Sequence, residues 1–245
     1  MSPVAETTGQ GGTRGRLLYL QNGTKRKTVS RLDERFAAAG LTVDSFWAYQ
    51  GEYPDSLEPY SGVFISGSPH GAYEDIDFIH RQHDLIVEIA ARGLPTLGIC
   101  FGSQILASAL CGRDQVFRRS FCEVGYKWLP LSAARAGDTL MEGLGDRVEM
   151  FVWHNDEVRA DHGDMTILAS SDLCPNQIWR YRDLPIWGIQ GHPEITLAQS
   201  RVWFEENRER LEKDGADVER LHESAVEAEE AKTMLSNFVR LCGAA

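Results

Sequence analysis

The 245-residue sequence has no long apolar run. A transmembrane helix needs about 18 or more consecutive apolar residues, so we expect neither a membrane span nor a membrane partner. Residues 1–15 lack the apolar core of a secretory signal peptide, and their Gly, Thr, Ser and Gln content predicts a disordered leader. We expect residues 16–245 to form a single domain.

Basic residues are in the minority, with 25 Lys and Arg against 36 Asp and Glu and a net charge of −11. Phosphate contacts dominate nucleic-acid affinity, so this balance argues against a nucleic-acid partner. No CxxC pair occurs and the cysteine count is odd, which argues against a metal site and a disulfide framework and predicts reduced thiols in a cytoplasmic protein. The cysteines are Cys100, Cys111, Cys122, Cys174 and Cys242.

Short apolar strands alternate with helical patterns over the first half of the sequence. This alternation is typical of βαβ units and predicts an α/β fold, with a mostly parallel central sheet and helices on both faces. Residues 116–168 look strand-rich, and from about residue 197 the sequence becomes helical and highly charged. The predicted strands are 16–20, 41–47, 62–66, 96–99 and 185–190, and the predicted helices are 28–39, 78–92, 101–110 and 234–241.

A cysteine lies where a predicted strand meets a predicted helix, in Gly98-Ile99-Cys100-Phe101-Gly102-Ser103-Gln104. Gly98 and Gly102 allow the two backbones to approach closely, as in the nucleophile elbow of hydrolases. Free N–H groups at the helix start favour an anionic sulfur, and the N–H of Phe101 would face a developing oxyanion. Taken alone, the string is equally compatible with a buried structural cysteine.

A histidine and a glutamate follow the last predicted strand, in Gly191-His192-Pro193-Glu194. Pro193 favours an extended backbone at His192, so the side chains two residues apart point the same way. Glu194 can then hold the imidazole, completing a nucleophile–base–orienter set with Cys100. By itself this string would read as a loop histidine beside a helix-initiating glutamate.

Both strings together, in this order, resemble the class I (triad-type) glutamine amidotransferase family over roughly residues 16–196. The matching strings are Gly98–Gln104 (family G-x-C-x-G-x-Q) and His192-Pro193-Glu194 (family H-P-E). The resemblance implies a flavodoxin-like, class I glutamine amidotransferase-like fold. It also implies that Cys100 is the nucleophile, His192 the base and Glu194 its orienter.

The family's oxyanion loop, S-G-G-P, reads Ser66-Gly67-Ser68-Pro69 here. The resemblance implies that the N–H groups of Ser68 and Phe101 form the oxyanion hole. It also implies that Gln104, Gly67, His154 and Asp156 bind the substrate. If the Ser68 position needs an unusual backbone, serine would carry a cost there.

The Gly-Ser-Pro loop and the string His154–Val158 look most like the γ-glutamyl peptidase members of the family. Three further residues are candidates for the mouth of the site. They are His70, Tyr73 and Glu74, which either line this mouth or face solvent.

The resemblance implies acyl transfer through a cysteine thioester, with no metal or organic cofactor. The substrate is glutamine, with ammonia passing to a separate synthase subunit, or else a γ-glutamyl peptide or amine that the protein cleaves alone. A third alternative is a non-catalytic binding module whose cysteine senses oxidation, as in DJ-1-like proteins. Retention of the His192–Glu194 pair argues against the third alternative, because a sensor needs no such pair.

Overall fold

The structure is a computed structural model that describes residues 15–26 and 31–243. The predicted leader, residues 1–15, lies outside the described residues except for Gly15, and so does the start of the helix predicted over 28–39. No helix in the described ranges is long and apolar enough to cross a membrane.

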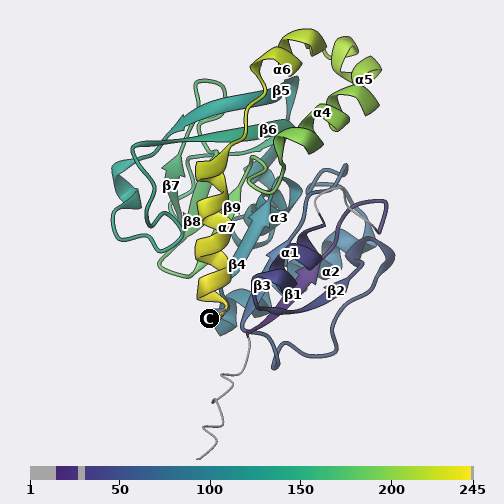
Figure 1. Cartoon of the computed structure of the whole chain (residues 1–245). Coiled ribbons are helices and arrows are strands. Elements are labelled where there is room, and N and C mark those ends of the chain that lie inside the picture. Colours follow the sequence, from purple (N-terminus) through teal and green to yellow (C-terminus); the bar gives the residue numbers. More distant parts are fainter. Residues whose placement is uncertain (1–14, 27–30, 244–245) are drawn as a thin grey trace, which may run out of the picture.

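A seven-stranded sheet with the order β2-β1-β3-β4-β9-β8-β7 forms the centre of the fold (Figure 1). Neighbours from β2 to β9 pair in parallel, whereas β8 and β7 join antiparallel at one edge. The predicted mostly parallel sheet is therefore confirmed. Its strands are β1 (Arg16–Leu20), β2 (Thr42–Phe46), β3 (Gly62–Ile65), β4 (Thr96–Ile99), β7 (Met165–Ala169), β8 (Ile178–Tyr181) and β9 (Ile186–Ile189).

Helices cover both faces of the sheet because its strands are apolar on both sides. Along β1, Leu17 and Tyr19 enter one core, while Leu18 and Leu20 enter the other, as side-chain alternation requires. Helices α1 and α7 contribute to the first core, and α2 and α3 to the second (Figure 1). These helices are α1 (Leu32–Ala38), α2 (Asp77–Arg92), α3 (Phe101–Leu110) and α7 (Glu229–Leu241).

The strand-rich middle of the sequence forms a separate antiparallel hairpin, β5 (Val116–Pro130) paired with β6 (Arg147–Val158). Its register is interrupted between Arg118 and Glu123, which is the sign of a β-bulge. The strand content of this region was predicted, but its separation from the central sheet was not, and β8 was not predicted at all.

The charged C-terminal region contains three short helices, α4 (Leu197–Glu206), α5 (Arg208–Lys213) and α6 (Val218–Ser224). Its helical character was predicted. A third apolar cluster holds it against the hairpin, with Phe204 of α4, Leu211 of α5 and Val218 of α6 buried around Phe151 of β6. These helices therefore pack over β6 through an apolar face, while their charged residues face outward.

Two glycines fix how closely β4, α3 and β3 pack. A Cβ at Gly98 would collide with the carbonyl oxygen of Gly102, and a Cβ at Gly102 would collide with the carbonyl oxygen of Ile65. Both obstacles are backbone atoms, which cannot move aside without shifting a strand or a helix.

We therefore expect Gly102→Ala to lower the free energy of unfolding by about 3 kcal/mol, the upper range for an overpacked core. Urea denaturation would measure the loss. Gly145→Ala is the matched control, because a Cβ there meets nothing within 4 Å. Equal stability of the two variants would show that the close approach at Gly102 is not a constraint.

Candidate active site

Cys100 occupies a strained turn between β4 and α3, with a positive φ of 53° and a ψ of −110°. Its N–H donates to the carbonyl of Ile189 at 2.8 Å, which continues the β4–β9 ladder. Its carbonyl accepts from the N–H of Gln104 at 3.1 Å, the first hydrogen bond of α3. The residue thus belongs to the strand and the helix at once, and the predicted sharp turn is present.

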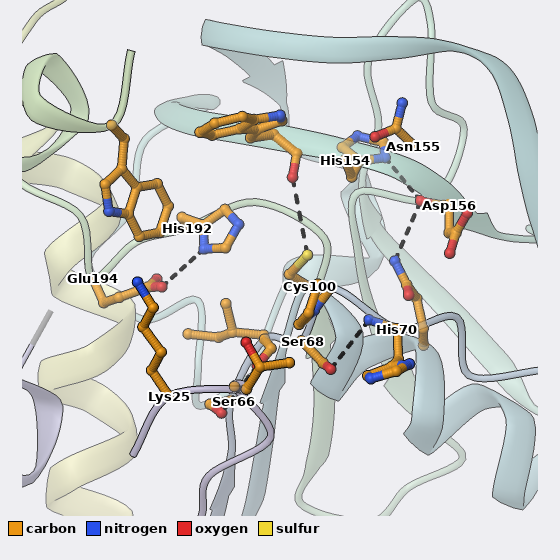
Figure 2. A pocket seen from close by; sticks show the side chains of 18 of the residues that line it. Lys25, Ser66, Ser68, His70, Cys100, His154, Asn155, Asp156, His192 and Glu194 are labelled. Atoms are coloured by element: carbon orange, nitrogen blue, oxygen red, sulfur yellow. Dashed lines mark hydrogen bonds and ion pairs between the residues drawn. The ribbon is translucent and has the colours of Figure 1, made fainter. Parts of the chain in front are cut away.

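His192 and Glu194 form a buried pair beside Cys100 (Figure 2). The His192 Nδ1 lies 2.8 Å from Glu194 Oε1, and the His192 N–H donates to the carbonyl of Phe151 at 2.7 Å. Trp203 meets the imidazole edge-on, with ring centroids 5.8 Å apart. The backbone bond and the aromatic contact fix the ring, and the carboxylate fixes Nδ1 as a proton donor.

The charge state of His192 follows from these neighbours. Burial alone would lower the pKa of His192, but the Glu194 carboxylate and the neighbouring side chain of Cys100 outweigh it and raise this pKa to about 10. An imidazolium is therefore held between a carboxylate and a sulfur, which is the arrangement that activates a cysteine nucleophile.

The loop after β3 approaches the same point from the neighbouring strand. A Cβ placed on Gly67 would be 3.7 Å from Cys100 Cβ and 3.8 Å from His192 Cε1, so Gly67 lies beside both residues. Ser68 is not among the described non-glycine residues with positive φ, which are Arg31, Cys100 and Arg182. The possible backbone cost of serine is thus absent, and Ser68 Oγ accepts from the His70 N–H at 3.2 Å.

Two of the predicted substrate residues, His154 and Asp156, lie on the other side of Cys100 from His192 (Figure 2). The carbonyl of Asp156 accepts from Gln104 Nε2 at 3.3 Å and lies 2.9 Å from His154 Nδ1. The His154 Nε2 is 3.0 Å from a Glu123 carboxylate oxygen. Both ring nitrogens of His154 are therefore engaged within the protein, and a substrate would meet only its backbone or ring carbons.

A second set of contacts surrounds the Asp156 side chain. Burial raises the pKa of Asp156, and Arg118, 3.3 Å away, opposes this rise. The hydroxyl of Tyr73 donates to the same carboxylate at 3.3 Å. Next to Tyr73, a carboxylate oxygen of Glu74 lies 2.8 Å from His70 Nδ1. His70 lines the cavity, whereas Tyr73 and Glu74 act through the residues they contact.

A cavity of about 390 Å³ joins these groups. Its lining includes all the predicted site residues except Phe101, whose predicted contribution is a backbone N–H. It also includes residues that the sequence analysis missed. Trp203, Asn207 and Arg210 are spaced as one helical face, a signal that the charged composition of the region hid. For others, among them Lys25, Arg118 and Trp153, the sequence carries no such signal.

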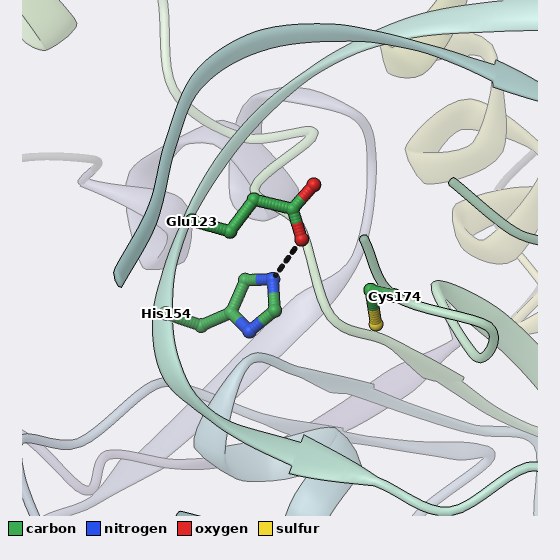
Figure 3. A group of neighbouring side chains, drawn as sticks. All are labelled: Glu123, His154 and Cys174. Atoms are coloured by element: carbon green, nitrogen blue, oxygen red, sulfur yellow. Dashed lines mark hydrogen bonds and ion pairs between the residues drawn. The ribbon is translucent and has the colours of Figure 1, made fainter. Parts of the chain in front are cut away.

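Glu123, His154 and Cys174 lie close enough behind the cavity to hold a metal ion, with ligand atoms within 4.8 Å of one another (Figure 3). The donors are already committed, however. The Glu123 oxygen that faces His154 also accepts from Arg119 at 3.2 Å, and burial raises the pKa of Cys174 far above its usual value. A protonated thiol and a carboxylate paired with Arg119 describe a buried ionic network better than a metal site.

The sequence matches the family model described as glutamine amidotransferase class-I over residues 25–208. The chain therefore belongs to this family. A glutamine amidotransferase from Thermotoga maritima superposes with a TM-score of 0.79 at 27% identity, covering 94% of this chain and 99% of that one.

Two similar proteins carry names that describe different activities. Gamma-glutamyl peptidase 3 of Arabidopsis thaliana is 31% identical over 166 residues, 65% of each chain, so the match spans less than two thirds of that relative's length. One component of the glutamine-hydrolyzing GMP synthase of Methanothermobacter thermautotrophicus is 28% identical over 135 residues, 55% of this chain and 65% of its own.

The raised pKa of His192 predicts a loss of stability at alkaline pH. Its folded-state pKa of about 10 exceeds the value of about 6.5 expected in the unfolded chain. The contribution to the free energy of unfolding is thus full below pH ~6.5 and is lost as the pH rises towards ~10. Glu194→Gln removes the main cause of the rise, so urea denaturation across this range should show a shallower loss than in the parent and in an exposed control, Glu206→Gln. Parallel profiles would contradict this assignment.

The buried network predicts a large cost for removing its central charge. In Glu123→Gln, Arg119 and His154 lose a carboxylate they share, so we expect the free energy of unfolding to fall by about 3 kcal/mol. Denaturant unfolding would measure this, again with Glu206→Gln as control. Zinc that stabilises the parent protein stoichiometrically would instead favour a metal site at Glu123, His154 and Cys174.

Proposed function

We propose that this protein is a cysteine hydrolase that cleaves γ-glutamyl amide bonds. The observation that carries the proposal is the position of Cys100, strained at a strand-to-helix turn and beside His192, whose Nδ1 lies 2.8 Å from Glu194 Oε1. Cys100 is the nucleophile, His192 the acid and base, and Glu194 the residue that orients the imidazole.

The proposed reaction is a two-step acyl transfer. The Cys100 sulfur attacks the γ-carbonyl carbon, and the N–H groups of Ser68 and Phe101 stabilise the oxyanion. His192 then gives its proton to the leaving nitrogen, and the C–N bond breaks to leave a γ-glutamyl thioester. Water then gives a proton to His192 and attacks the thioester, which releases glutamate and restores the Cys100 sulfur and the imidazolium of the starting state. No metal or organic cofactor takes part in this scheme.

A γ-glutamyl peptide is the substrate class we favour. The cavity of about 390 Å³ falls within the range that holds drug-sized ligands, so it has room beyond the glutamyl group for a leaving group larger than ammonia. The similarity to the plant γ-glutamyl peptidase supports the same choice. In this case the protein acts without a synthase.

Glutamine is the second candidate substrate. The similarity to a component of a GMP synthase, whose name describes a glutamine-hydrolysing enzyme, favours it. In this case the ammonia would pass to a separate synthase protein. The least supported alternative is a cysteine sensor without catalysis, because it gives no role to an imidazolium held beside the Cys100 sulfur.

We expect the purified protein to release glutamate from γ-glutamyl dipeptides faster than from glutamine, and Cys100→Ala to reduce the rate at least ~10³-fold. Cys111→Ala is the matched control, because burial raises the pKa of that thiol to about 12, which leaves it unreactive. Turnover of glutamine alone, or only with an added synthase, would favour the second candidate. Release that survives Cys100→Ala would refute the nucleophile assignment.

A further inference from the structure

A chain of buried polar side chains lies behind the oxyanion loop, residues 66–69, and has no part in the reaction scheme above. It runs from Gln82 on α2, through Asn22 after β1, to Ser66 after β3, and all three residues are buried. Gln82 Nε2 donates to Asn22 Oδ1 at 2.7 Å, and Asn22 Nδ2 donates to the carbonyl of Ser66 at 3.2 Å. Because these groups are shielded from water, their hydrogen bonds to one another are costly to break.

This chain begins where the backbone pairing of β1 with β3 stops. The last paired residues are Leu20 and Ile65, and the Ser66 N–H still donates to the Leu20 carbonyl at 3.1 Å. Beyond this point the Asn22 N–H donates to Ser66 Oγ at 2.9 Å, so a side chain replaces the strand partner. The contact between β1 and β3 is thereby extended to the start of the oxyanion loop.

The hydroxyl of Ser66 has one proton, and its neighbours decide where that proton goes. The Asn22 N–H can only donate, so the hydroxyl accepts there and keeps its own proton for another partner. That partner is the Gly67 carbonyl, whose oxygen lies 3.2 Å from Ser66 Oγ. The hydroxyl thus connects Asn22 to the peptide between Gly67 and Ser68.

Holding the Gly67 carbonyl sets the direction of the Ser68 N–H. The two groups belong to one planar trans peptide, in which they point in opposite directions. The Ser68 N–H donates to no other described residue, and Ser68 lines the cavity together with Cys100 (Figure 2). A donor that is fixed in direction but left unpaired is what an oxyanion hole requires.

We propose that Ser66, Asn22 and Gln82 are positioning residues for the oxyanion hole. Gln82 fixes the Asn22 amide, Asn22 fixes Ser66, and the Ser66 hydroxyl fixes the peptide that carries the Ser68 N–H. This N–H then needs no reorientation when the tetrahedral intermediate forms. The proposal rests on the proposed function, because an oxyanion develops only when the nucleophile attacks a carbonyl carbon.

The test compares two reactions of Cys100, only one of which passes through an oxyanion. In the first, the sulfur attacks the carbonyl carbon of p-nitrophenyl acetate, and the oxyanion collapses to an acetyl thioester and p-nitrophenolate. In the second, the sulfur displaces iodide from iodoacetamide, and no oxyanion forms. The Cys100→Ala protein gives the background rate of each reaction from the other thiols.

We expect Ser66→Ala to slow acetylation of Cys100 ~10-fold and to leave its alkylation within ~2-fold of the parent rate, because a misdirected oxyanion donor costs part of what a lost one does. Gln82→Met breaks the chain at its far end and should slow acetylation ~5-fold for the same reason. Ser132→Ala is the matched control and should change neither rate. The Ser132 hydroxyl also donates to a backbone carbonyl, that of Ile167 at 2.7 Å, but Ser132 lies outside the cavity lining.

Two outcomes would overturn the proposal. One is an acetylation rate that Ser66→Ala or Gln82→Met leaves unchanged, since the chain requires both ends. The other is an equal fall in acetylation and alkylation, which would mean that the chain supports the Cys100–His192 pair and not the oxyanion hole.

Turnover of a γ-glutamyl dipeptide separates this proposal from the proposed function. Ser66→Ala should lower kcat ~10-fold and leave KM within ~2-fold, because the oxyanion forms only after the substrate has bound. If the parent protein cleaves no γ-glutamyl compound but the acetylation result holds, the positioning chain stands and the substrate class fails. If the dipeptide is cleaved but Ser66→Ala leaves acetylation unchanged, the proposed function stands and the positioning chain fails.

Discussion

The reversal of the backbone at Cys100 is the constraint on which the site depends. A positive φ is energetically costly for a cysteine. Here the backbone of Cys100 is held by a strand hydrogen bond on one side and a helix hydrogen bond on the other. The sheet order places β3, β4 and β9 side by side and parallel, so their carboxyl ends meet at one edge. Gly67, Cys100 and His192 follow these three strands, and the sheet therefore brings them together without any long loop.

This part of the structure could be predicted because its signals are local. The bounds of β1, β4 and α3 are those expected from the sequence, since apolar runs and flanking glycines mark them. The pairing of His192 with Glu194 needs only an extended backbone across Pro193. The resemblance to a known family then joined two strings that are each ambiguous alone.

The rest depended on contacts between distant segments, which periodicity does not reveal. Glu123 lies in a strand of alternating character and reads as solvent-facing, yet it is buried against His154 across the hairpin. The strand β8 has four residues with an arginine among them, too few to show a pattern. Trp203 and Arg210 lie in a region dominated by charge, and only the apolar cluster beneath it shows that this region closes the cavity.

Charged side chains behind the cavity are paired more completely than those that line it. Behind the cavity, Glu123 is met by Arg119 and His154, so the wall that carries the Asp156 carbonyl is neutralised internally and held rigid. Inside the cavity, Lys25 is left without a partner among the described residues. A network that only stabilises the fold gains from complete pairing, whereas a binding site must keep its interactions unsatisfied until the ligand arrives.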